Sequence, residues 1–287
     1  MPSQLRLLAV HAHPDDESSK GAATSAKYAA QGARVMVATC TGGERGDVLN
    51  PTYQPQNLNT EQMAQVRRKE MAAAATALGI EHRWLGYVDS GLPEGYPQAP
   101  LPQGCFGLLD VAAAARPLIA LIREFRPQVM TTYDPNGGYP HPDHIMCHKI
   151  SVYAYEQAGK DVFSELGQPH QVSKLYYNHD FSLIKIKRIH EALLEAGMDS
   201  PFGDWISSRE ISLVPQRQAT TRIEVAEFFA QRDAALLAHA TQIDPQGFFF
   251  AVPRDFEAEV WPFEEFELAD AKVATEFVET DLFAGID

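Results

Sequence analysis

The sequence crowds two histidines and three acidic residues into one stretch that directly follows a short apolar run. The run covers residues 5–10, and the stretch after it, residues 11–17, reads HAHPDDE. Such a run predicts a strand buried on both faces of a parallel sheet. Imidazole and carboxylate groups packed this closely at a strand end repel one another or stay unpaired unless a cation holds them together. The stretch therefore predicts one half of a metal site.

Composition and charge limit the classes of partner. Of the 287 residues, 45% are hydrophobic and 22% are charged, which is typical of a globular protein with a sizeable core. A formal charge of −14 argues against nucleic acid or an anionic membrane as the main partner. There is no membrane-length apolar run or N-terminal signal pattern, and three scattered cysteines do not make a disulfide framework. We therefore expect a cytoplasmic protein that acts on a small molecule. The sequence does not indicate its oligomeric state.

The apolar periodicity alternates between strands and helices over the first 180 residues. Strands are predicted at residues 5–10, 33–40, 82–85, 128–133 and 172–177. Helices are predicted from residue 18 or 19 to 31, over 60–78, from a first turn that contains Pro117 to about residue 125, and over 142–158. This alternation predicts an α/β fold with a doubly wound, Rossmann-like, mostly parallel sheet over residues 1–180.

The signals weaken in the last third of the chain. Residues 182–196 and 226–241 have helical patterns, and residues 220–225 lie between them as a strand. We expect residues 181–287 to form a C-terminal α+β lobe that packs on the core, covers the active site and lines the substrate pocket.

A second histidine-rich stretch at residues 140–144, PHPDH, repeats the His-Pro-Asp pattern of residues 13–15. Both stretches lie just past the predicted carboxyl ends of strands, where a doubly wound sheet brings loops together. A mixed histidine and carboxylate set with an open position suits catalytic zinc, and it also accepts Fe²⁺. Water on such a metal reaches a pKa of about 7 and can lose its proton to a nearby carboxylate.

Several neighbouring residues have simpler structural interpretations. His11 is either a ligand or a core histidine, and we favour the core role. Cys147 and His148 either form a second ligand face or are a buried thiol and a hydrogen-bonded histidine, which is the commoner case. Asp143 also suits the start of a helix. Cys40 at a strand end is predicted to be a core residue, because no partner base is evident.

The two motifs carry a family resemblance. HAHPDDE together with residues 133–144, YDPNGGYPHPDH, resembles the LmbE-like (PIG-L type) zinc de-N-acetylase superfamily. Residues 17–21, 41–46, 88–93, 239–245 and 261–262 are similar to the branch of this family that acts on mycothiol S-conjugates. The resemblance covers nearly the whole chain.

The resemblance implies a cytoplasmic zinc amidase of thiol-based detoxification, with one zinc ion per chain. It would cleave the amide between glucosaminyl-inositol and an S-conjugated N-acetylcysteine and release a mercapturic acid. Two alternatives use the same site. One is deacetylation of N-acetylglucosaminyl-inositol in mycothiol biosynthesis, and the other is amide hydrolysis of one dedicated conjugate in antibiotic biosynthesis.

The resemblance also assigns the metal site and its base. The implied ligands are His13, Asp16 and His144, and the implied general base is Asp15. A carboxylate that binds the metal cannot also be the free base, which explains two adjacent aspartates.

The remaining catalytic roles in the family fall on three residues of the second motif. His141 would stabilise the tetrahedral oxyanion or protonate the leaving amine, and Asp143 would orient His141. Tyr139 would polarise the carbonyl. Amide hydrolysis needs oxyanion stabilisation and protonation of the departing nitrogen, so these roles agree with the chemistry.

By resemblance, the polar end of the substrate is bound by Arg67, Asp89 and Asp47, where some relatives carry glutamate in place of Asp47. Lys20 lies one turn past the metal turn and is a candidate for contact with the thiol-conjugate half, because the related deacetylase of mycothiol biosynthesis lacks a lysine at its position. Each has an alternative. Arg67 at i,i+3 from Glu70 could form an exposed ion pair on a helix, and Lys20 could be a surface lysine.

Two other classes of protein fit poorly. A dinucleotide-binding oxidoreductase needs a Gly-x-Gly-x-x-Gly pattern after the first strand, where this chain has the histidine and aspartate cluster. A sugar-binding module without catalysis has no use for Asp15 beside a complete ligand set.

Overall fold

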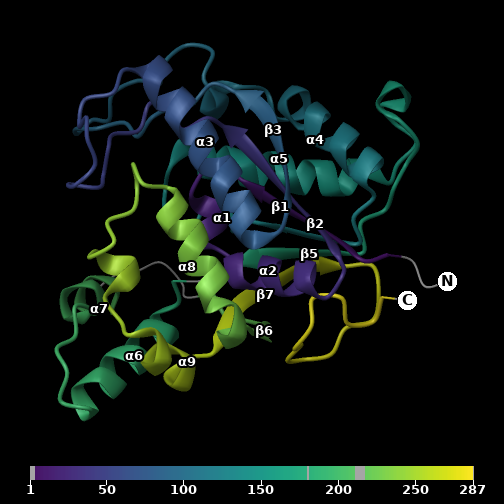
Figure 1. Cartoon of the computed structure of the whole chain (residues 1–287). Helices are drawn as coiled ribbons and strands as arrows, with labels where there is room; N and C mark the ends of the chain where they lie inside the picture. Colours follow the sequence, from purple (N-terminus) through teal and green to yellow (C-terminus); the bar gives the residue numbers. More distant parts are fainter. Residues whose placement is uncertain (1–3, 180, 211–216, 287) are drawn as a thin grey trace.

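A seven-stranded sheet forms the centre of the molecule (Figure 1). The computed structural model describes residues 4–179, 181–210 and 217–286. The strand order is β3-β2-β1-β4-β5-β7-β6. The five strands from β3 to β5 are parallel, and β7 pairs antiparallel with both β5 and β6. The strands are β1 (Arg6–His11), β2 (Arg34–Thr41), β3 (Glu81–Tyr87), β4 (Val129–Thr132), β5 (Lys174–Asn178), β6 (Thr221–Glu224) and β7 (Phe263–Ala271).

Helices cover both faces of the sheet, and residues of β1 alternate between them. Leu8 and Val10 pack in the core formed with α4 and α5, whereas Ala9 packs with residues of α3 on the other face. Near this second face α2, α3 and α8 share a small-residue cluster. The helices are α1 (Asp16–Ser19), α2 (Ala22–Ala30), α3 (Thr60–Leu78), α4 (Val111–Phe125), α5 (Pro142–Ala158), α6 (Leu183–Glu195), α7 (Gly203–Glu210), α8 (Phe229–Ala238) and α9 (Arg254–Val260). The predicted fold class, a doubly wound and mostly parallel α/β sheet, is confirmed.

The single helix predicted from residue 18 or 19 to 31 is wrong. The structure has a one-turn helix, α1, and a separate α2, with Gly21 between them at φ +72°. The carboxylate of Glu264 in β7 accepts the N–H groups of Ala23 and Thr24 at 3.1 and 2.7 Å. This contact from a distant strand supplies acceptors for the backbone N–H groups at the N-terminus of α2. In a continuous helix, carbonyls of the preceding turn would accept these N–H groups.

The placement of Pro117 in a first turn is also wrong. Helix α4 begins at Val111, where the Asp110 carboxylate accepts the N–H of Ala113 at 2.9 Å. Pro117 lies in the helix interior on the exposed side. The helix is stabilised by its capped N-terminus and by burial of Ala114, Ala115 and Leu118. This stabilisation exceeds the free-energy cost of the one backbone hydrogen bond that proline cannot make.

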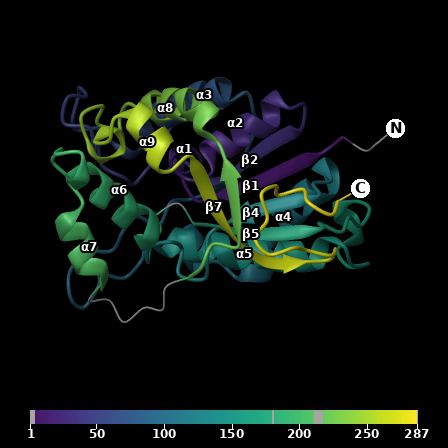
Figure 2. The same ribbon diagram turned by 90° about the horizontal axis from the view of Figure 1, so that it is seen from below.

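The later part of the chain adds strands to the same sheet and also forms helices that pack outside the sheet. Strands β6 and β7 extend the sheet, while α6, α7 and the 252–261 segment form a separate apolar cluster. Seen from below, this cluster lies on the side of the molecule opposite the two termini (Figure 2). The predicted boundary at residue 180 lies outside the described residues, and the division into two domains stays a prediction.

Among the described residues, no helix combines the length and the apolar character that a membrane span requires.

A buried arginine of α4 holds the loop after α5 in place through hydrogen bonds. The guanidinium of Arg123, 5% exposed, donates to five backbone carbonyls between residues 158 and 167 at 2.6–3.1 Å. We expect Arg123→Lys to lower the free energy of unfolding by about 2–4 kcal/mol, because an ammonium cannot satisfy all five buried carbonyls. Urea denaturation measures this change. Arg116→Lys on the same helix is the control. Arg116 forms an exposed ion pair with Glu165, so the urea midpoint of the Arg116→Lys variant should equal that of the unchanged protein. Equal stability of both variants would contradict the account.

Candidate active site at the ends of the central strands

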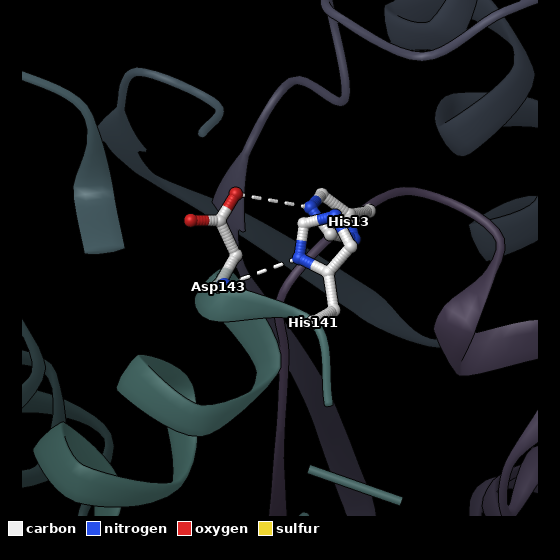
Figure 3. Close-up of side chains that lie close together, drawn as sticks. All are labelled: His13, His141 and Asp143. Atoms are coloured by element: carbon white, nitrogen blue, oxygen red, sulfur yellow. Dashed lines mark hydrogen bonds and ion pairs between the residues drawn. The ribbon is translucent and has the colours of Figure 1, made fainter. Parts of the chain in front are cut away.

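The two histidine motifs meet at one edge of the sheet. His13 follows β1, and His141 is the residue before α5, at the end of the loop that leaves β4. Because β1 and β4 are neighbours, their carboxyl ends lie side by side. The rings of His13 and His141 are 4.7 Å apart between centroids, and the Asp143 carboxylate faces His13 (Figure 3). The fold thus joins two stretches that are distant in sequence.

Three buried side chains form a group that could hold a metal ion. His13, Asp16 and His144 each offer a ligand atom, and these atoms lie within 4.8 Å of one another. The Nε2 atom of His144 lies 3.5 Å from Oδ2 of Asp16, and Nδ1 of His13 lies 3.6 Å from the same oxygen. The group has the mixed nitrogen and oxygen donors that a catalytic divalent metal uses.

The orientation of His144 fits a metal ligand. Its Nδ1 lies 2.9 Å from the carbonyl oxygen of Gly137, so Nδ1 carries the proton and Nε2 is left with a lone pair. That Nε2 is buried and has no hydrogen-bond partner among the described residues. Burial lowers the pKa of His144 to about 3, which keeps the ring neutral as a ligand must be. An unpaired buried nitrogen aimed at a carboxylate is satisfied by a cation.

A second group of three, His13, His141 and Asp143, shares His13 with the first. Its other two members are already engaged. Nδ1 of His141 accepts the N–H of Asp143 at 3.1 Å, and the Asp143 carboxylate accepts the N–H of Ser90 at 2.9 Å and the Ser90 hydroxyl. The unpartnered Nε2 of His144 favours the first group as the metal site.

Asp15 is held in an unusual backbone conformation beside this group. Its φ is +90°, a value that non-glycine residues rarely adopt and that is often found at functional sites. Arg67 donates from Nη2 to Oδ2 of Asp15 at 2.5 Å, and also binds the carbonyls of Pro14 and Gly43. The Asp15 side chain keeps 25% of its surface exposed, compared with 5% for Asp16. Of the two aspartates, Asp15 is therefore the one open to a substrate.

Arg67 reaches this turn through a gap that only glycine leaves. A Cβ atom at Gly43 would lie 2.0 Å from Nη1 of Arg67. Arg67 is 4% exposed, and Glu70 binds Thr241 instead, so the alternative of an exposed Arg67–Glu70 pair is wrong. A direct role of Arg67 in substrate binding stays a prediction.

Lys20 compensates the charge of Asp16. Its ammonium donates to Oδ1 of Asp16 at 2.8 Å and to the Ser19 hydroxyl at 3.0 Å. Burial opposes ionisation of Asp16, but Lys20 and the two nearby histidines hold the pKa of its carboxyl well below the usual range. Only 13% of the Lys20 side chain is exposed, so the alternative of a surface lysine is wrong.

Glu17 pairs with His239, a partner that was not predicted. Its Oε1 lies 2.6 Å from Nε2 of His239, at the end of α8, and both residues are buried. The other oxygen of Glu17 accepts the N–H of Asp15 at 3.0 Å. Burial opposes ionisation of Glu17, but His239 and Ser18 lower its pKa to about 2. His239 lies in the 239–245 stretch that carries the resemblance, yet no local pattern connects it with Glu17.

His141 is placed as a neutral donor. Because its Nδ1 accepts the Asp143 N–H, the proton lies on Nε2, and burial lowers the pKa of the ring below its usual value. The orientation of His141 by Asp143 thus comes from the backbone, while the Asp143 carboxylate binds Ser90 and His13. The Tyr139 ring is 43% exposed and lies 4.6 Å from the His144 ring.

The two acidic residues predicted to bind substrate differ in exposure. Asp89 is buried, and its carboxylate accepts the N–H groups of Arg45 and Gly91 and lies 3.7 Å from Nε2 of His13. The Asp47 side chain is exposed, and its backbone carbonyl accepts a hydrogen bond from Gln242. Their roles toward a substrate stay predictions.

The structural interpretations of the neighbouring residues are confirmed. His11 is buried and belongs to neither candidate metal group among the described residues. Cys40 and Cys147 are free, buried thiols. His148 is hydrogen-bonded to the carbonyl of Tyr133 at 2.9 Å.

Comparison with known proteins places the chain in a family. Residues 8–155 match the PIG-L family model, described as GlcNAc-PI de-N-acetylase. The chain belongs to this family. It is 55% identical to the mycothiol S-conjugate amidase of Streptomyces coelicolor, with 100% of this chain and 99% of the relative aligned. The family assignment by resemblance is thereby confirmed.

The chain is also similar to a curated deacetylase and, in its fold, to a solved structure. The 1D-myo-inositol 2-acetamido-2-deoxy-alpha-D-glucopyranoside deacetylase of Streptomyces avermitilis is 38% identical over 98% of this chain and 97% of its own. The solved structure of N,N'-diacetylchitobiose deacetylase from Pyrococcus horikoshii has a TM-score of 0.61 at 17% identity, over 92% of this chain and 83% of that one. The second likeness supports the fold alone.

The metal group generates a direct prediction. We expect Asp16→Asn and His144→Gln each to weaken zinc binding by more than about 100-fold. Loss of a residue that only hydrogen-bonds to a metal ligand already lowers the metal affinity by about 10–100-fold, and loss of the ligand itself should cost more. Titration of metal-free protein with zinc, followed by calorimetry, measures the affinity. His148→Gln, one turn further along α5, is the matched control and should bind zinc as the unchanged protein does. Tight zinc binding by both ligand variants would show that the metal lies elsewhere.

Proposed function

We propose that this chain is a zinc-dependent amidase that hydrolyses mycothiol S-conjugates. The bond cleaved is the amide between glucosaminyl-inositol and the S-conjugated N-acetylcysteine, and the product released is a mercapturic acid. The substrate is supported by 55% identity over the full length to an enzyme of that name. The reaction class is supported by the buried His13, Asp16 and His144 group with Asp15 beside it.

Zinc is the metal that this donor set suits best, with Fe²⁺ as the alternative. His13, Asp16 and His144 would hold it. When bound, the metal supplies a water of lowered pKa and a Lewis acid for the amide carbonyl. All other steps fall to side chains of the chain itself.

Asp15 takes the proton from the attacking water. Arg67 holds Oδ2 of Asp15, which leaves Oδ1 as the atom that accepts the proton. Burial raises the pKa of Asp15 and Arg67 opposes this rise, so that the net pKa lies above the usual value. A carboxylate with a raised pKa is a better proton acceptor near neutral pH.

His141 acts on the substrate carbonyl as a neutral hydrogen-bond donor. Its Nε2–H donates to the carbonyl oxygen as that oxygen becomes negative. The departing amine receives the proton that Asp15 took from the water. Tyr139 contributes a second donor from its half-exposed loop. Asp89, Asp47 and Arg67 lie around the turn and its neighbouring loops, where they bind or position the sugar-inositol half. Lys20 is assigned to the thiol-conjugate half.

Deacetylation of N-acetylglucosaminyl-inositol is the second candidate function, since relatives of that name are about as long and 38% identical. We test the two on purified, zinc-loaded protein with a bimane conjugate of mycothiol and with N-acetylglucosaminyl-inositol. We expect kcat/KM to be at least about tenfold higher for the conjugate, a discrimination of the size that pocket contacts provide. A preference for the acetylated sugar would overturn the substrate, and activity unaffected by chelators would overturn the metal mechanism.

The role of Asp15 is tested by Asp15→Asn. We expect kcat for the conjugate to fall by about 10²- to 10⁴-fold, the usual contribution of a general base, while the zinc content stays the same. Asp110→Asn is the matched control, because asparagine also caps a helix and Asp110 lies at the start of α4. Full turnover by zinc-loaded Asp15→Asn would rule out this base.

A further inference from the structure

An apolar pocket adjoins α1, the one-turn helix that begins at the proposed metal ligand Asp16. Its cavity has a volume of about 80 Å³ and a mouth that is open to solvent. Ser18 and Ser19 of α1 form part of its lining. The pocket is therefore in direct contact with the turn that carries the candidate active site.

Phenylalanine rings and aliphatic side chains make up most of the wall. Phe248 is central, since its ring centroid lies 6.2 Å from Phe181, 5.6 Å from Phe202 and 5.8 Å from Phe249. Phe181 and Phe248 are 40% and 42% exposed, although large apolar side chains are usually more deeply buried. A cluster of rings left open in this way is typical of a ligand site.

Four of the five charged residues of the lining are already paired, and the fifth is Lys185. Arg232 forms a two-pronged pair with Glu257 at 3.0 and 2.8 Å, and Arg254 binds Glu257 and Asp233. Glu264 accepts the N–H groups at the start of α2. The four paired groups do not need a polar ligand, and most of the wall is apolar. The pocket therefore suits a largely apolar group better than a sugar or inositol ring.

A short chain of hydrogen bonds links the pocket to the metal group. The ammonium of Lys20 binds the hydroxyl of Ser19, a lining residue, and the carboxylate of Asp16. The pocket wall is thus separated from a proposed ligand by the single side chain of Lys20.

The pocket and the polar loops come from different parts of the sheet. Asp47 and Asp89 follow β2 and β3. Apart from Ser18 and Ser19, the pocket is built by residues that come after β5 in the chain, and β1 lies between β2 and β5 in the strand order. Helices α6, α8 and α9, which contribute to the pocket, lie together on the side away from the termini in Figures 1 and 2. The amine and acyl halves of an amide substrate extend from the scissile bond in opposite directions. Polar loops on one side of β1 and a pocket on the other side could therefore bind one half each.

We propose that this pocket receives the S-substituent of the conjugate and that it selects apolar, above all aromatic, substituents. The inference rests on the proposed function, because it identifies the acyl half of that substrate as the ligand. Stacking and burial of an aromatic group between Phe181, Phe248 and their neighbours would supply the selectivity.

The test compares two mycothiol conjugates that differ only in the S-substituent, benzyl and methyl, on the zinc-loaded enzyme. We expect Phe248→Ala to lower kcat/KM for the S-benzyl conjugate by about tenfold, chiefly through KM, as loss of one aromatic contact predicts. The S-methyl conjugate should change by less than about twofold, since it does not reach the ring. Phe277→Ala is the matched control, because Phe277 is 80% exposed and lines no part of the pocket.

The outcomes separate this inference from the function on which it rests. Equal losses for both conjugates, or no loss for either, in a variant with unchanged thermal unfolding would overturn the pocket and leave the proposed function standing. If Phe248→Ala does not fold, Phe181→Ala at the same mouth carries the same expectation. Failure of the unchanged enzyme to cleave either conjugate would overturn the proposed function, and the pocket assignment with it.

Discussion

Three acidic side chains in succession on one tight turn determine how the rest of the structure is arranged. A carboxylate removed from water without a partner costs several kcal/mol, and here three lie largely buried within one turn of helix. Each has a separate cationic partner: Asp15 has Arg67, Asp16 has Lys20 and Glu17 has His239. Because Arg67 lies on α3 and His239 at the end of α8, the turn is stable only when both helices are in place.

The end of α8 connects more than one part of the site. Residue Thr241 donates from its N–H and its hydroxyl to the carboxylate of Glu70, one turn along α3 from Arg67. Its carbonyl accepts the N–H groups of Leu49 and Asn50 from the loop after β2. The residues that follow α8 thus join the metal turn, α3 and the glycine-containing loop. This explains physically why the resemblance to relatives extends into a segment with no catalytic group of its own.

Local patterns in the sequence predicted much of the core. Helix α3 was predicted with its observed bounds, because it is rich in helix-forming residues and Gly79 ends it. The structure adds a capping box of Asn59 and Gln62 at its start. The strands β1, β2, β4 and β5 were found from apolar runs, each within two residues of its observed start. The two histidine motifs were found because each combines ligand residues with a strand end. The geometry then placed His13, Asp16 and His144 together.

What the sequence did not reveal depends on long-range contacts. Strand β7 (FEEFELADA) is rich in acidic residues, and only its pairing with β5 and β6 explains their place in a sheet. Glu17 and His239 are 222 positions apart, so no spacing rule connects them. The break at Gly21 depends on Glu264 of β7, again a distant partner.

The central claim is that His13, Asp16 and His144 bind the metal while Asp15 stays free for the water. A crystal structure of the zinc-loaded protein, with anomalous data at the zinc edge, tests it most directly. We predict one zinc about 2.0–2.2 Å from two imidazole nitrogens and one Asp16 oxygen, with Asp15 still paired to Arg67. Zinc bound by His141 and Asp143, or by Asp15, would contradict the account.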